Sequence, residues 1–465
     1  MDQISKLTLQ EGATPTHGVS FREAFWVWVR VAALSFGGPA GQIAVMHRIL
    51  VEEKRWVSEN RFLHALNYCM LLPGPEAQQL AVYIGWLLHK TAGGLLAGSL
   101  FVLPGFISIL ILSILYASFQ QTLLIQALFF GLKPAVMAVV VEAVIRIGKR
   151  ALKNEAMVGL AAFAFIAIFF FDVPFPAIIL MAALIGYSGG RVWPEKFYVI
   201  KGHQSPAVTI ASDQAAIADT AAAHTAPSLK RAVTVIGIGL AVWFGPLLIL
   251  AALFGPQSIF VTLGTFFSQA AMVTFGGAYA VLVYVGQQAV ERFGWVTPRE
   301  MLDGLGMAET TPGPLIMVLQ FVGFMAAYRN PGPLSPLAAG VLGSIVTTWV
   351  TFAPCFLWIF LGAPYIEYLR GNKALSTALS GITAAVVGVI MNLAVWFSLH
   401  TLFGQVNEVY VGPLHLQIPV WSSLDGAALL IAIGAFIATF RFHLSMVWTL
   451  AGCATAGLVY FLATA

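Results

Sequence analysis

Residues 35–39 read Ser-Phe-Gly-Gly-Pro, and a variant of this stretch, Thr-Phe-Gly-Gly-Ala, occupies residues 274–278, which lie 239 positions later. Two further motifs recur at the same offset: Trp56-Val57 as Trp295-Val296, and Pro73-Gly74-Pro75 as Pro312-Gly313-Pro314. A single Gly-Gly match would be chance, but three motifs in constant register indicate an internal duplication.

The duplication divides the chain into two homologous halves. Further along, the offset becomes 250, so that Gly131 corresponds to Gly381, and the eleven extra residues fit a loop at 329–339 that is rich in Pro and Gly. The predicted organisation is an N-terminal tail at 1–20, a first repeat at 21–190, a polar linker at 191–230, a second repeat with a leading helix at 231–400, and a C-terminal loop and helix pair at 401–465.

The amino-acid composition of the chain is typical of a membrane protein. Of the 465 residues, 59% are hydrophobic and only 9% are charged, whereas a soluble domain carries about a quarter charged residues. The 44 glycines and 23 prolines also suit membrane helices better than soluble ones. We therefore expect an all-α polytopic membrane protein.

The same composition argues against several functions. The net charge of +4 is spread over loops, so we expect no nucleic-acid partner. The sequence contains no GxxxxGK[ST] nucleotide loop, no nucleophile motif and no metal-ligand spacing, so we expect neither an enzyme nor a cofactor. The three cysteines lie far apart in apolar stretches and are expected to be buried packing residues: Cys69, Cys355 and Cys453.

Thirteen apolar runs approach the length of about 20 helical residues that a bilayer core requires. They lie near 22–46, 62–88, 94–118, 122–146, 156–171, 174–190, 231–254, 261–288, 300–327, 336–362, 374–399, 425–440 and 444–464. The repeats begin at the first and the eighth run, and this odd difference predicts that the two halves are inverted relative to each other.

Loop charge supports the inversion. Residues 146–153 carry four Lys and Arg, whereas their counterpart at 400–424 carries none. By the positive-inside rule this places the N-terminus and the linker in the cytoplasm and the C-terminus in the periplasm. The basic segment at 48–61 disagrees, unless it folds back into the protein or the second run is re-entrant.

The repeated motifs mark candidate breaks in the helices. Proline removes a backbone donor and glycine lets the backbone approach a ligand, and a restarted helix presents free N–H groups that suit an anion. Packing kinks are the alternative interpretation. The candidate substrate-binding residues at the breaks, including two nearby amides, are Gly37, Gly38, Gln42, Pro73, Gly74, Pro75, Gln78, Gly276, Gly277 and Gly313.

Two cations within apolar runs could bind an anion. Lys133 has no acidic residue within one helical turn along the sequence, which makes it the first choice. Arg30 lies two turns before Gly37 and two turns after Glu23, so it could bind an oxyanion or form a structural pair with Glu23.

Three acidic residues receive separate interpretations. Glu76 and Glu309 flank the two Pro-Gly-Pro motifs and are candidate proton carriers, and Glu76 could instead cap the restarted helix. Glu142 and Arg146 are spaced i,i+4 and are interpreted as a structural pair.

Two halves that each contain Phe-Gly-Gly, Trp-Val and Pro-Gly-Pro resemble the chromate ion transporter family in its long, two-domain form. The match rests on 36–39, 55–57 and 72–78, with degenerate second copies at 275–277, at Trp295 and at 311–314. The second copy departs from the first where Ala278 replaces Pro39 and Leu315 replaces Glu76, so we expect the first half to contribute more to the site.

The resemblance implies an inner-membrane secondary transporter that exports chromate, gives chromate resistance and uses the proton motive force. Chromate is a tetrahedral dianion like sulfate, so a sulfate or other oxyanion carrier is one alternative, and an anion channel or receptor is another. The expected partners are the transported anion and the lipid bilayer, and a homodimer stays open as the assembly.

Overall fold

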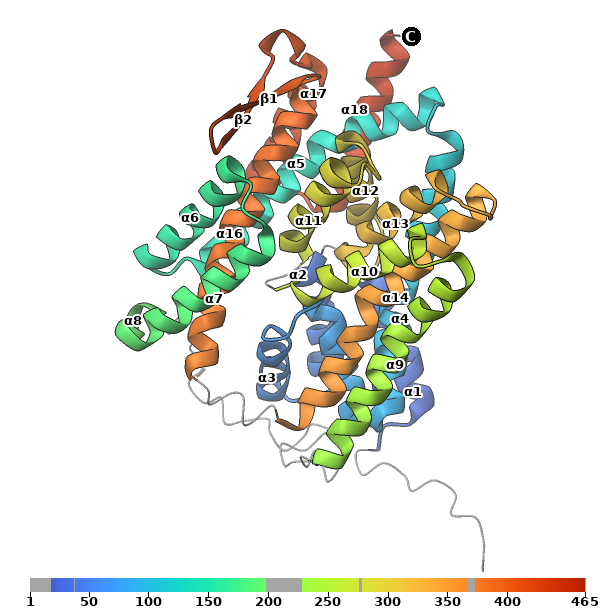
Figure 1. Ribbon diagram of the computed structural model, residues 1–465, viewed down its shortest axis with the longest axis vertical. Coiled ribbons are helices and arrows are strands. Elements are labelled where there is room, and N and C mark those ends of the chain that lie inside the picture. Colours follow the sequence, from blue (N-terminus) through green and yellow to red (C-terminus); the bar gives the residue numbers. More distant parts are fainter. Residues whose placement is uncertain (1–17, 37, 198–227, 276–277, 366–372, 465) are drawn as a thin grey trace, which may run out of the picture.

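The computed structural model describes residues 18–36, 38–197, 228–275, 278–365 and 373–464, which fold mostly into helices (Figure 1). Within these residues seven helices are long and apolar enough to cross a membrane, and four shorter apolar helices accompany them. The chain is therefore a multi-pass helical membrane protein. The expected number of thirteen crossings stays a prediction.

The first half begins with short helices around the Gly-Gly motif. A short helix at 59–69, called a half-helix below, precedes the Pro-Gly-Pro loop and is followed by a helical hairpin and longer helices. The elements of the first half are α1 (Phe21–Leu34), α2 (Gly38–His47), the π-helical η1 (Arg48–Glu53), α3 (Glu59–Cys69), α4 (Glu76–Phe119), α5 (Leu123–Ala151), α6 (Glu155–Phe171), α7 (Phe175–Val192) and the one-turn α8 (Pro194–Phe197). The long α4 turns back on itself at His89 and Lys90, whose backbone angles are not helical, and Gly85 packs against Gly93 across the turn.

The second half repeats this order after a leading helix. Its elements are α9 (Leu229–Phe254), α10 (Ile259–Met272), α11 (Ala278–Gln287), the π-helical η4 (Gln288–Arg292), α12 (Pro298–Thr310), η5 (Leu315–Met317), α13 (Val318–Arg329), α14 (Pro336–Gly362), η6 (Ala363–Tyr365), α16 (Lys373–Leu402), α17 (Gly426–Phe436), η8 (Ile437–Arg441) and α18 (Met446–Thr464). The predicted breaks are present, because four of the expected runs are each divided at a repeated motif: 22–46, 62–88, 261–288 and 300–327.

Local sequence explains where the two half-helices, α3 and α12, begin. The Ser58 hydroxyl accepts a hydrogen bond from the Arg61 amide at the start of α3. At the start of α12, Thr297 and Glu300 form a reciprocal capping box, and Pro298 occupies the first turn. Such caps satisfy amides that have no partner within the helix. Both half-helices therefore begin at a defined residue.

The two halves are interlocked. Helices α6 and α7 of the first half pack on α16 of the second, and α17 and α18 of the second half pack on α5 of the first (Figure 1). Glycines allow these helices to approach closely, because a Cβ on Gly131 would clash with the Cys453 carbonyl and one on Gly381 with the Ala182 carbonyl. Gly131 and Gly381 are the pair matched at the offset of 250, so the sequence repeat is also a repeat of packing.

Between α16 and α17 the chain forms a small antiparallel hairpin that the sequence analysis treated as a loop. Its strands are β1 (Val406–Val411) and β2 (Leu414–Pro419). On β2, His415 Nδ1 lies 3.0 Å from the carboxylate of Asp172, which ends α6. The hairpin adds strands to a fold that we expected to be all-α, and it links the second half to the first.

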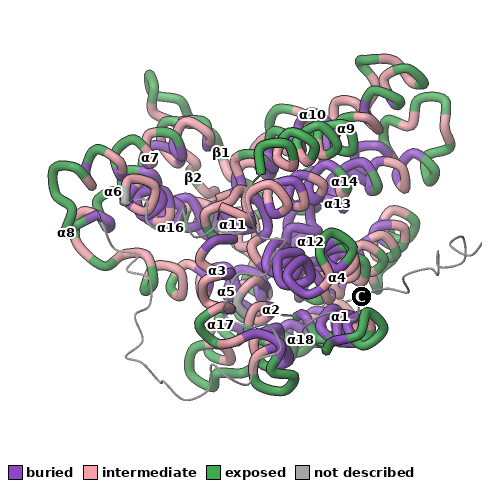
Figure 2. Tube along the Cα trace, turned by 90° about the horizontal axis from the view of Figure 1, so that it is seen from below, coloured by how far each residue is buried: buried purple, intermediate pink, exposed green. Residues whose placement is uncertain are grey.

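Burial is greatest in the middle of the molecule. Figure 2 shows buried segments in the centre, including α12, and exposed residues around the perimeter, including α9. All residues of α12 from Glu300 to Glu309 are buried, although this helix is polar for a membrane protein. The half-helix thus places acidic side chains inside the protein, where they need partners.

Candidate functional site

The first Pro-Gly-Pro loop contacts the second half of the chain. The Gly74 amide donates a hydrogen bond of 2.8 Å to the Thr274 carbonyl, which precedes the second Gly-Gly motif. Gly74 has a φ of 125°, and a Cβ there would lie 2.7 Å from Cys355 Sγ. Only glycine allows this loop to approach α10 and α14 so closely.

The second Pro-Gly-Pro loop makes the reciprocal contact. The Gly313 amide donates a hydrogen bond of 2.9 Å to the Ser35 carbonyl, which precedes the first Gly-Gly motif. Gly313 has a φ of 105°, and a Cβ there would lie 2.9 Å from Gly105 Cα. Each half therefore supplies the partner for the other half's break, and the four motifs meet at the interface between the repeats.

The first Gly-Gly motif adds a side-chain contact. Gln42 is buried on α2, and its Nε2 donates a hydrogen bond of 2.5 Å to the Gly313 carbonyl. Gly38 starts α2 with a φ of 67°, and no atom lies within 4 Å of the position a Cβ would take. The expected site residues Gly37, Gly276 and Gly277 lie outside the residues that the structure describes.

The helix that restarts after the first break is polar at its beginning. The Gln78 side chain is fully buried, and neither of its amide atoms has a hydrogen-bond partner. Gln79 donates to the Pro73 carbonyl, but its buried Oε1 has no donor. Glu76, the first residue of α4, makes no side-chain hydrogen bond or ion pair within the described part of the chain.

Buried polar atoms without partners are rare and need an explanation. At the start of α4 the unpaired amide of Gln78 lies in the same turn as the first backbone N–H groups of the helix, which also lack helical partners. The corresponding turn of the second half contains only apolar residues, at 315–317. A polar ligand therefore finds more hydrogen-bonding groups at the first break.

Lys133 has an acidic partner that its sequence neighbours did not reveal. Its Nζ lies 3.1 Å from Oδ1 of Asp303 on α12, and the other carboxylate oxygen accepts a hydrogen bond of 2.8 Å from the Tyr116 hydroxyl. The side chains of Lys133 and Asp303 are 19% and 6% exposed. A cation of the first half thus lies inside the protein and faces a carboxylate of the second.

Arg30 pairs with a different carboxylate from the one that its sequence neighbours suggested. Its guanidinium contacts Glu53 of η1, with Nη1 and Oε2 2.7 Å apart, and its side chain is half exposed. Glu23 instead pairs with Lys54, at 2.9 Å. The expected pair between Arg30 and Glu23 is therefore wrong, because the π-helical turn brings its own charged residues against α1.

Glu309 and Glu142 each have a partner in the structure, and the cysteines are buried. The Tyr279 hydroxyl donates a hydrogen bond of 2.6 Å to Glu309, whose other oxygen is buried without a donor. Glu142 and Arg146 form the expected i,i+4 pair at 3.7 Å. The expected burial of the three cysteines is confirmed, and all three are free thiols: Cys69, Cys355 and Cys453.

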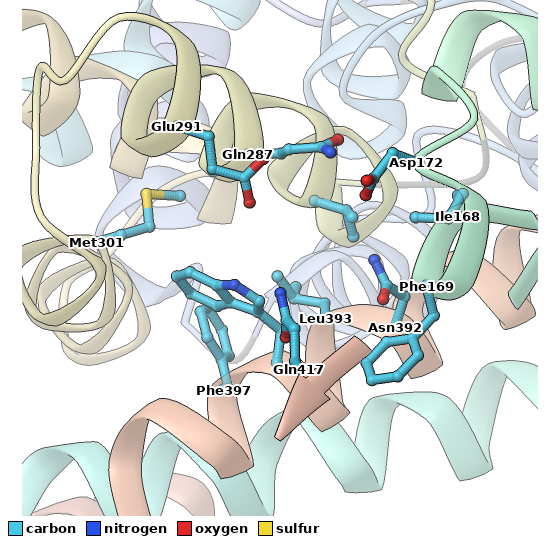
Figure 3. Close-up of a pocket in the computed structure, with 13 residues that line it drawn as sticks. Ile168, Phe169, Asp172, Gln287, Glu291, Met301, Asn392, Leu393, Phe397 and Gln417 are labelled. Carbon is cyan, nitrogen blue, oxygen red and sulfur yellow. The ribbon is translucent and has the colours of Figure 1, made fainter. Parts of the chain in front are cut away.

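A separate pocket opens beside the hairpin (Figure 3). It is lined by residues of α6, α11, η4, α12, α16 and β2, and its two charged lining residues are Asp172 and Glu291. Glu291 lies outside the candidate spans, and burial raises the pKa of its carboxyl to about 7, with Glu408 and Asp172 acting in the same direction. Two carboxyl groups make this pocket unfavourable for a dianion.

Sequence reasoning missed Asp303, Tyr116 and Cys355 as members of these contacts. Asp303 is an ionisable residue within an expected apolar run at 300–327, and that signal alone would have qualified it as a functional candidate. Tyr116 and Cys355 carry no comparable signal, because only the packing of α4 and α14 places them near the site.

The fold and the paired breaks define a class of protein. A duplicated multi-pass membrane protein whose interrupted helices meet at the interface between its repeats has the architecture of a secondary transporter. A family model described as "Chromate transporter" matches residues 22–187 and 261–458, one region in each half. The chain belongs to the chromate transporter family.

Individual relatives agree with this assignment. The chromate transport protein of Pseudomonas aeruginosa is 32% identical over 377 residues, which cover 80% of each chain. The chromate transport protein of Cupriavidus metallidurans is 27% identical over 380 residues, which cover 81% of this chain and 82% of that protein. The uncharacterized transporter YwrA of Bacillus subtilis is 26% identical over 164 residues, which are 90% of that protein but 35% of this chain. No solved structure matches the chain.

Proposed function

We propose that this protein exports chromate across the inner membrane, gives chromate resistance and is driven by the proton motive force. The observation that carries the proposal is the reciprocal pair of contacts at the breaks, Gly74 to Thr274 and Gly313 to Ser35. They bring two interrupted helices together at the interface of the repeats, where transporters of this architecture bind substrate. The names of the two relatives above, both chromate transport proteins, support chromate as the transported anion.

The first break is the proposed anion site. A helix start carries about half a positive charge, and the start of α4 also has the unpaired amide of Gln78 to donate hydrogen bonds. Helix starts alone do not balance a dianion, so we assign Lys133 as the fixed cation. Both cations have a carboxylate partner, but Arg30 is the weaker candidate because its side chain is half exposed, whereas that of Lys133 lies inside the protein.

The electrical part of the proton motive force is sufficient to favour export. Moving one charge through 100 mV is worth about 2.3 kcal/mol, so a dianion leaving a negative interior gains roughly twice that. Glu76 and Glu309 are the proposed proton carriers, since each is an acid beside a Pro-Gly-Pro motif and one carboxylate oxygen of Glu309 is buried without a donor. The N-terminus and linker are proposed to be cytoplasmic and the C-terminus periplasmic.

Chromate flux in everted membrane vesicles tests the proposal. Radiolabelled chromate should accumulate in vesicles that contain the protein, saturate with concentration, and fall when the membrane potential or the proton gradient is collapsed. Vesicles without the protein serve as the control. Flux that does not saturate would indicate a channel, and complete competition by equal sulfate would indicate a general oxyanion carrier on the same scaffold.

A further inference from the structure

Asp303 is a buried carboxylate that the proposed site does not use, although it contacts the proposed anion-binding cation. Lys133 comes from α5 and Tyr116 from α4, both in the first half, whereas Asp303 comes from α12 in the second. α12 leads directly into the second Pro-Gly-Pro loop. The cluster of Lys133, Asp303 and Tyr116 therefore joins the two repeats at the helix that leads into the second break.

The two contacts of the carboxylate differ in kind. Tyr116 donates a hydrogen bond of 2.8 Å to Oδ2, whereas Lys133 Nζ forms an ion pair with Oδ1 at 3.1 Å. The tyrosine is a neutral donor, so its hydrogen bond does not require a charged carboxylate, whereas the attraction of the ammonium depends on that charge. Lys133 therefore becomes available to another anion when Asp303 is neutralised.

Few other charges face this cluster. Glu300 lies one turn earlier on α12, and Arg329 at the end of α13 binds it at 2.5 Å, so that pair is already balanced. Of the other elements packed on α12, residues 315–328 and 374–399 contain no charged residue. The two remaining helices carry further charged residues, but none of these forms an ion pair with Asp303 within the described residues: Glu76 and Lys90 on α4, and Glu142, Arg146, Lys149 and Arg150 on α5. Within the described part of the chain, Lys133 is consequently the cation that compensates Asp303.

We propose that Asp303 is an internal counter-ion that the transported dianion displaces from Lys133, and that Asp303 takes up one proton as it is displaced. The inference rests on the proposed function, because it requires Lys133 to bind the anion. The proton adds to Oδ1 and forms a neutral carboxylic acid, the hydrogen bond from Tyr116 to Oδ2 stays, and Lys133 keeps its own proton.

Charge balance explains why the proton is needed. If Asp303 stayed ionised, the ammonium, the carboxylate and the dianion would sum to two negative charges in a buried site. Protonation reduces that sum to one, and an unpaired buried charge is costly. The loaded site would then carry one net negative charge, so the membrane potential still favours its exit from a negative interior.

Chromate binding to the purified full-length protein, measured from about pH 6 to pH 8.5, tests the proposal. Wild-type affinity should fall by up to about tenfold for each unit by which the pH rises, because Asp303 is ionised in the free protein and binding takes up one proton. Asp303→Asn should bind more tightly than wild type at the alkaline end and lose this additional slope. The protonation of chromate itself affects both proteins equally, so the difference between them isolates Asp303.

Matched variants separate this role from a structural one. Glu300→Gln removes a neighbouring carboxylate of the same helix and should keep the wild-type slope. The double variant Lys133→Gln/Asp303→Asn removes both charges and leaves neither unpaired, so it should fold but bind chromate at least about tenfold more weakly.

Different contrary results would overturn the counter-ion role and the proposed function. If wild type and Asp303→Asn show the same slope, or if the double variant binds like wild type, the counter-ion role is overturned while the proposed function stands. If wild type shows no saturable binding, the proposed function fails as well. Should Asp303→Asn not fold, proton uptake by wild type on adding chromate at about pH 8 decides, because the absence of uptake contradicts the proposal.

Discussion

Gly38 and Gly74 illustrate how single residues shape the breaks. Both have positive φ angles, but a Cβ on Gly74 would clash with Cys355, whereas a Cβ on Gly38 would meet open space. A side chain at Gly74 is therefore expected to disturb folding as well as transport. Gly38 is the residue at which the two effects can be separated.

We predict that Gly38→Leu abolishes chromate transport and leaves the amount of protein in the membrane nearly unchanged. The backbone cost of a left-handed non-glycine residue is about 1–2 kcal/mol, and the added side chain would fill the space beside the break. Gly332→Leu is the control, because Gly332 also has a positive φ (58°) and open space around it but lies in a loop remote from the breaks. Loss of Gly38→Leu from the membrane would favour a packing kink over an anion site.

A second residue-scale prediction concerns Arg30. Arg30→Lys keeps the charge but loses the planar fork of the guanidinium. Because the wild-type partner is Glu53 and the pair is half exposed, the exchange should cost about 1 kcal/mol of stability or less. Chromate affinity, measured by direct binding, should not change. A loss of roughly tenfold or more would place Arg30 on the anion.

Among the elements, η4 and the hairpin surround the acidic pocket. The pKa of Glu291 is about 7 in the folded protein against an ordinary value of 4.5, so its ionisation opposes folding. Stability should therefore fall as the pH rises from about 4.5 to 7. We predict that Glu291→Gln has the same thermal midpoint as wild type near pH 4 and a higher one near pH 8. Equal midpoints at both pH values would contradict this account of the pocket.

The elements also show what sequence patterns can and cannot predict. Glycine and proline act locally, so the positions of all four breaks were predictable from 35–39, 73–75 and their repeats. The partner of Lys133 was not, because Asp303 is 170 residues away in sequence and only the packing of α5 on α12 brings the two together. The π-helical turns likewise gave no local signal, and they changed the partner of Arg30.

At the scale of the molecule, the halves cannot be separated without losing the site. Each Pro-Gly-Pro loop is hydrogen-bonded to the other half, and each terminal helix pair packs on a helix of the other half. Relative motion of the repeats would therefore alter both breaks together. The match to YwrA covers 35% of this chain, about the length of one repeat.

The last prediction concerns how these halves are inserted in the membrane. α6 runs from Asn154, which caps its start beside the basic segment 146–153, to Asp172, which binds the hairpin. Its 17 residues span about 25 Å, close to the thickness of a bilayer core. If the halves are inverted, the basic segment is cytoplasmic and the hairpin is periplasmic.

Cysteine labelling of intact cells with an impermeant thiol reagent measures this directly. Lys149→Cys should be shielded and Asn407→Cys labelled, since both positions are exposed on the protein but lie beyond opposite ends of α6. The three native cysteines are buried and give little background. Lys149→Cys should become reactive once the cells are permeabilised, which shows that the membrane and not the protein protected it. Equal labelling of the two positions in intact cells would rule out the inverted arrangement and leave the reciprocal breaks to be explained by a parallel repeat.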